Sequence, residues 1–77
     1  MISFINRDTA QEHLELVERH VVEGRLRVAA QVALTARLEG QGRDTDQAKM
    51  LLHRLEETLA LQIQTRSRIA QELSGGM

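Results

Sequence analysis

One short polar stretch divides this chain into two long helical patterns. Residues 40–45 read Gly-Gln-Gly-Arg-Asp-Thr and hold two of the five glycines. Glycine adopts the left-handed conformation that ends a helix, and Gly40 is the expected stop. Asp44 can cap the helix that follows. The sequence therefore predicts a helical hairpin, with a first helix over about 6–39, a turn over 40–45, a second helix over about 46–73 and a frayed tail over 74–77.

The composition favours helices over strands. Proline is absent, and Phe4 is the only aromatic residue. Leu, Ala, Glu, Gln and Arg are frequent, and all are good helix formers, whereas strands favour aromatic and β-branched residues. A chain of 77 residues allows one small domain. We therefore expect an all-α protein with a single hairpin domain over residues 1–77.

An apolar stripe runs along each predicted helix, and the two stripes fit one antiparallel register. The residue numbers of every facing pair sum to 83 or 84, so one antiparallel register satisfies all pairs. The spacing resembles the heptads of a coiled coil. The predicted seam pairs Leu14 with Ile69, Val17 with Arg66, Val21 with Ile63, Gly24 with Leu59, Val28 with Leu55, Val32 with Leu52 and Thr35 with Ala48, and it ends at Leu73.

This seam leaves a second apolar surface without a partner. Eight of the eleven residues in 26–36 are apolar and cover most of the helix circumference. A helix that is apolar nearly all round is normally buried on several sides, and a small chain without cysteines has no disulfide to stabilise it. The sequence therefore predicts a homodimer packed as a four-helix bundle. The expected interface comprises Leu16, Val22, Leu26, Ala29, Ala30, Ala33 and Leu34, and Leu51 and Leu61 also point away from the seam.

Charge and hydropathy argue against nucleic-acid and membrane partners. The 10 basic and 11 acidic residues give a formal net charge of −1, so no basic surplus is present to bind phosphates. The apolar runs are much shorter than a membrane span. Residues 1–5 are apolar but lack the basic region of a signal peptide. The expected location is a bacterial cytoplasm.

No residue pattern indicates catalysis or a cofactor. His13 and His20 lie seven apart on one side of the first predicted helix, but a metal site needs more ligands than two, so we interpret both as boundary residues beside the seam. Two helices also enclose no pocket. The chain is therefore predicted to be neither an enzyme nor a cofactor-binding protein.

Two residues interrupt the apolar seam. Arg66 is expected to extend its charged end into solvent or to pair with Glu15 or Glu18, and the alternative is a buried group that fixes the register or the oligomeric state. Gly24 is less favourable than alanine inside a helix, by about 1 kcal/mol. We expect it to form a notch in which Leu59 packs, and the alternative is a bend at which another element approaches.

One stretch resembles a known family. Residues 53–59, His-Arg-Leu-Glu-Glu-Thr-Leu, are similar to the phospho-accepting stretch of bacterial sensor histidine kinases, where a His-Arg pair opens a helix segment within a dimeric hairpin. The asparagines of that family are replaced here by Glu57 and Thr58, and the chain has no room for a nucleotide-binding domain. The resemblance implies at most that an exposed His53 accepts a phosphoryl group from another protein.

The sequence thus leads to two hypotheses about function. The first is a structural or interaction module that associates with itself and presents a surface to a larger protein. The alternative is a phosphorelay-type helical protein with His53 as the phospho-acceptor.

Overall fold

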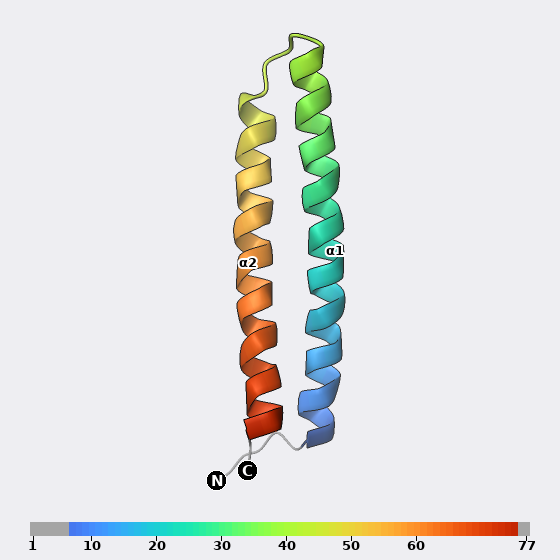
Figure 1. The fold of residues 1–77 in the computed structure, drawn as a ribbon, viewed down its shortest axis with the longest axis vertical. Coiled ribbons are helices and arrows are strands. Elements are labelled where there is room, and N and C mark those ends of the chain that lie inside the picture. Colours follow the sequence, from blue (N-terminus) through green and yellow to red (C-terminus); the bar gives the residue numbers. More distant parts are fainter. Residues whose placement is uncertain (1–6, 76–77) are drawn as a thin grey trace.

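The computed structural model describes residues 7–75 and shows two long helices side by side (Figure 1). Helix α1 spans Arg7–Gly40 and helix α2 spans Asp46–Gly75. They run antiparallel and form a rod that measures 58 × 17 × 15 Å. The predicted all-α helical hairpin is confirmed, and residues 7–75 contain no strand.

The helix ends differ slightly from the predicted ones. Helix α2 continues to Gly75, although the sequence predicted a frayed tail from residue 74. The predicted start of the first helix at residue 6 lies outside the described residues.

Helix α1 ends in a Schellman motif built on Gly42. The Gly42 N–H donates to the carbonyl of Glu39 at 3.0 Å, and the Arg43 N–H donates to the carbonyl of Leu38 at 2.9 Å. Gly42 has a φ of 71°, in the left-handed region that favours glycine. Gly40, the predicted stop, is still helical, and the chain leaves the helix at Gly42, two residues later.

Helix α2 begins with backbone and side-chain caps. The carbonyl of Thr45 accepts from the Lys49 N–H at 2.9 Å, which is the first hydrogen bond of the helix. Oδ1 of Asp44 accepts from the Asp46 N–H at 2.9 Å, so it satisfies one of the N–H groups that a helix start leaves free. Asp44 therefore caps the helix start as predicted, although it accepts from the N–H of Asp46 rather than from that of Gln47. An ion pair between Lys49 and Glu39, at 3.2 Å, joins the two helices beside the loop.

The two helices meet along a seam whose members are four and three residues apart in strict alternation. This spacing repeats every seven residues, as in a coiled coil. The apolar core of the described residues is small: Val17, Val21 and Ile69 are buried, and only Val21, at 1% exposure, is fully buried. Buried or half-buried seam residues are Ala10, Leu14, Val17, Val21, Gly24, Val28, Gln31, Thr35 and Leu38 on α1, and Ala48, Leu52, Leu55, Leu59, Gln62, Arg66, Ile69 and Leu73 on α2.

One predicted seam residue was wrong, and another, Ile63, is half-buried beside the seam position that Gln62 occupies. Val32 is 47% exposed, whereas its neighbour Gln31 is buried. Nε2 of Gln31 donates to the carbonyl of Ala48 at 3.0 Å, so the amide crosses the seam with its donor satisfied. The physical reason is the strict alternation, which moves three residues on from Val28 and therefore reaches position 31.

Gly24 lies where the helices approach most tightly among the described glycines. A Cβ at this position would lie 3.1 Å from Cδ1 of Leu59 and 2.9 Å from Oε1 of Gln62. The notch expected for Leu59 is therefore present, and Gln62 shares it. Oε1 of Gln62 is buried and accepts no hydrogen bond from the described residues.

This orphaned oxygen leads to a first prediction. Gln62→Met should raise the free energy of unfolding by about 1 kcal/mol, because methionine has a similar unbranched shape and leaves no unsatisfied acceptor. Gln31→Met is the matched control, since it removes the hydrogen bond to Ala48. Urea denaturation of both variants measures the difference. A larger gain from Gln31→Met than from Gln62→Met would contradict the prediction.

Candidate interaction surface

An exposed apolar stripe runs along α1 on nearly the opposite side from the seam. Val22 is 57% exposed and Leu26 is 66% exposed, and three exposed alanines continue the stripe towards the loop. The spacing again alternates between four and three residues, so these side chains share one face. We call this set the outer stripe: Val22, Leu26, Ala29, Ala33 and Ala36.

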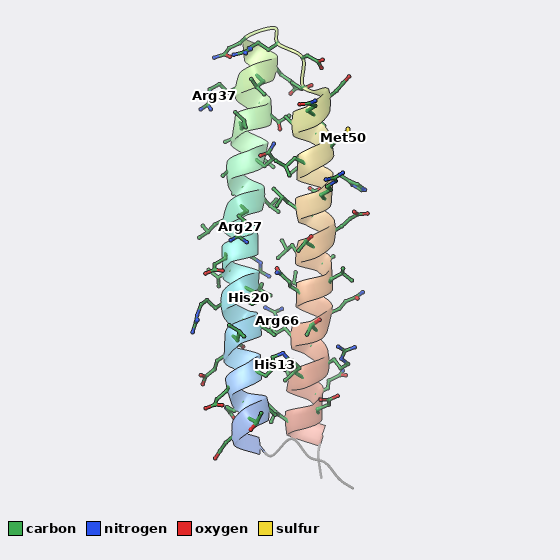
Figure 2. All side chains as sticks on the ribbon, turned by 180° about the vertical axis from the view of Figure 1, so that it is seen from behind. His13, His20, Arg27, Arg37, Met50 and Arg66 are labelled. Carbon is green, nitrogen blue, oxygen red and sulfur yellow. The ribbon has the colours of Figure 1, made fainter. Side chains whose placement is uncertain are left out.

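Two rows with seven-residue spacing flank the outer stripe, and each mixes charged and apolar residues. All their members are exposed. Figure 2 shows Arg37 pointing outward from α1, away from α2. The Ala30 row comprises Leu16, Glu23, Ala30 and Arg37, and the Val32 row comprises Glu18, Arg25, Val32 and Glu39.

Most residues predicted for the interface lie on this side of α1. Leu34 is the exception, because it is half-buried and faces an open groove between the helices near the loop. Val32, which the sequence placed in the seam, lies instead beside the outer stripe. The predicted interface residues that are exposed on this side are Leu16, Val22, Leu26, Ala29, Ala30 and Ala33.

The groove beside Leu34 has a volume of about 640 Å³. Leu38 and Leu51 contribute its other large apolar side chains, and the polar lining includes Arg43 and Asp44 from the loop. Elsewhere on α2, Met50 and Leu61 are exposed, and Met50 points outward in Figure 2. The sequence interpretation included Leu51 and Leu61 but missed Met50, whose neighbours on the helix surface include Lys49, His53 and Arg54.

Arg66 is half-buried in the seam and lies between the two helices in Figure 2. Within residues 7–75, the close contacts between basic and acidic side chains join Lys49 to Glu39 and His53 to Glu57. The predicted pairing of Arg66 with Glu15 or Glu18 is therefore absent from this part of the chain.

An arginine at this position leads to a second prediction. Arg66→Leu should keep the fold and raise the melting temperature, with a gain of roughly 1 kcal/mol from the additional apolar contact. Thermal melting followed by circular dichroism measures the stability, and light scattering measures the oligomeric state. A changed oligomeric state would mean that Arg66 specifies assembly, and an unfolded variant would contradict both interpretations.

Within residues 7–75, the three histidines do not belong to any cluster of potential metal ligands. His13 and His20 are exposed on α1, and residues 7–75 contain no group of three His, Cys, Asp or Glu that could hold a metal ion. The side chain of His53 is 72% exposed, and its Nε2 lies 3.2 Å from Oε2 of Glu57, one turn further along α2.

Comparison with known proteins gives no relative: no protein family, curated protein or solved structure matches this chain. Neither helix, over residues 7–75, has an apolar stretch of the length needed to cross a bilayer.

Proposed function

We propose that this protein is a homodimer in which two hairpins pack as a four-helix bundle, and that it serves as a structural or protein-interaction module in a bacterial cytoplasm. The observation that carries the proposal is the exposure of the outer stripe, where Val22 and Leu26 are both more than half exposed in a single hairpin. Soluble monomers rarely leave a contiguous apolar face of this kind in water.

The small apolar core of the hairpin supports the same proposal. With only Val17, Val21 and Ile69 buried as apolar core in the described residues, the hairpin gains much of its stability from a second copy of the chain.

The module is proposed to present a second surface to a larger protein. Met50 and Leu61 are exposed on α2, on the helix that does not carry the outer stripe. Exposed methionines are common on surfaces that bind protein partners, because the flexible thioether adapts to different shapes.

Self-association makes a direct prediction about the wild-type protein. Sedimentation equilibrium at micromolar concentration should give the mass of a dimer, and the melting temperature should rise with protein concentration because association stabilises the folded state. A well-folded monomer with a melting temperature independent of dilution would refute the proposal.

A second candidate function rests on the exposure of His53. Its imidazole is open to solvent and has a carboxylate within 3.2 Å, and both features suit a histidine that accepts a phosphoryl group. Incubation with phosphoramidate as a phosphoryl donor should then add one phosphoryl group to the wild type and none to His53→Gln, as read by intact mass. If His13 or His20 reacts equally well, exposure alone explains the modification.

A further inference from the structure

We infer that two copies of this chain meet through their α1 helices, which run antiparallel around a two-fold axis beside residue 31. This inference rests on the proposed self-association and adds the orientation and register of the partner. It is carried by three observations on the exposed side of α1: two charged rows, the sizes of the stripe residues, and a glycine that the hairpin itself does not explain.

The charges of the Val32 row are complementary to those of the same row in a second, antiparallel copy of the chain. Reading towards the loop it contains a base, an apolar residue and an acid: Arg25, Val32 and Glu39. In an antiparallel pair centred near residue 31, Arg25 of each copy lies opposite Glu39 of the other, and the two copies of Val32 meet at the axis. Glu39 already contacts Lys49 at 3.2 Å, so Arg25 of the second copy would complete a network of alternating charge.

The Ala30 row has the same property with the signs exchanged. It contains Glu23, Ala30 and Arg37, in that order. The same two-fold axis brings Glu23 of each copy to Arg37 of the other, and the small Ala30 side chains meet at the axis. Two independent rows, centred on residues 30 and 32, thus select one register.

The outer stripe packs large side chains against small ones in this register. Leu26 faces Ala36 of the second copy, and Ala29 faces Ala33. Such alternation lets helices approach closely, within the 8–10 Å range of helix packing. The remaining layer places Val22 opposite Gly40.

Gly40 supports the close approach independently. It is helical, its φ is not positive, and a Cβ added to it would meet nothing within 4 Å. Nothing within the hairpin therefore requires glycine at this position, although glycine weakens a helix. A valine side chain from the second copy, arriving at Gly40, is a physical reason for it.

Other arrangements of the same stripe fit less well. In a parallel pair Glu18 lies close to Glu23 of the other copy, and Arg37 lies beside Val32. An antiparallel pair shifted by one heptad towards the start of α1 places Glu18 opposite Glu39. Like charges at facing positions disfavour both arrangements.

The inferred register fixes the order of the four helices. The outer stripe lies nearly opposite the seam, so the two α1 helices are central and each α2 lies on an outer side, which makes the proposed four-helix bundle a flattened one. Met50 and Leu61 on α2 then remain uncovered.

Single cysteines test this geometry, because the natural chain contains none. Val32→Cys should form a disulfide-linked dimer under mild oxidation, since facing residues beside a two-fold axis bring their Cβ atoms within reach. Leu26→Cys is the control: in the inferred register its two copies are some ten residues apart along the helix, roughly 15 Å, and cannot bridge. Linkage of Leu26→Cys without Val32→Cys would establish the parallel arrangement and overturn the inference.

Charge reversal gives a second measurement that does not need a new bond. Arg37→Glu should raise the dimer dissociation constant roughly tenfold, because the two-fold axis repeats each broken pair. The double variant Glu23→Arg/Arg37→Glu restores complementarity within one chain and should bring the constant back towards that of the wild type. A double variant with a higher dissociation constant than either single variant would exclude the register. These outcomes are separate from failure of the proposed function, which would appear as a monomeric wild type.

Discussion

Ala33→Asp is expected to dissociate the dimer, with at least a hundredfold rise in the dissociation constant. Ala33 is exposed in the single hairpin, so a carboxylate there remains hydrated as long as the chain is alone. In the proposed dimer the same carboxylate would be enclosed between helices without a counter-charge, which costs several kcal/mol. The effect therefore reports the partner rather than the fold of the hairpin. Sedimentation equilibrium measures it directly.

Gln64→Asp is the matched control for that experiment. Gln64 is also an exposed helical residue, but it lies on α2, and aspartate carries a similar helix-propensity penalty at both positions. We expect Gln64→Asp to keep the dissociation constant of the wild type. Equal weakening by both variants would show that α1 has no special role in association.

Val21→Asp is expected to abolish the hairpin. Val21 is 1% exposed and is the most completely buried side chain described. An unpaired carboxylate in this seam costs roughly 3–5 kcal/mol, a large share of the 5–15 kcal/mol that holds an ordinary domain together. The helical signal in circular dichroism should be lost over the whole micromolar range.

The neighbouring residue gives the contrasting result. Val22 is exposed on the outer stripe, so Val22→Asp should weaken association and leave the seam intact. Its helical signal should recover as the protein concentration rises, because mass action favours the associated state. If concentration rescues Val21→Asp instead, the assignment of the two faces of α1 is wrong.

The hairpin was predictable because its signals are local and repetitive. The glycine-containing turn, the absence of proline and the paired stripes all agree, and agreement between levels is what makes a sequence specify one fold. The position of Gly24 opposite Leu59 followed from the register alone.

The two wrong predictions, for Val32 and for the stop at Gly40, have physical causes that hydropathy alone does not reveal. Val32 was placed in the seam because it is apolar, but heptad geometry puts Gln31 there, and a hydrogen bond to Ala48 makes the polar side chain acceptable. Strict alternation of three and four residues would have found this. The stop at Gly40 was displaced to Gly42 because the left-handed residue follows the last helical one by two positions, a choice set by backbone hydrogen bonds.

The seam and the outer stripe of α1 share one period, which restricts how the protein can change in length. Loss of a single residue from the middle of α1 would rotate everything beyond it by about 100° and separate both faces from their partners. Loss of residues 11–17 together with residues 66–72, which lie opposite them in the register, would remove one complete repeat from each helix. The outer stripe would be untouched. Insertions and deletions are therefore expected to be tolerated only in whole blocks of seven residues, added to or removed from both helices at the same level.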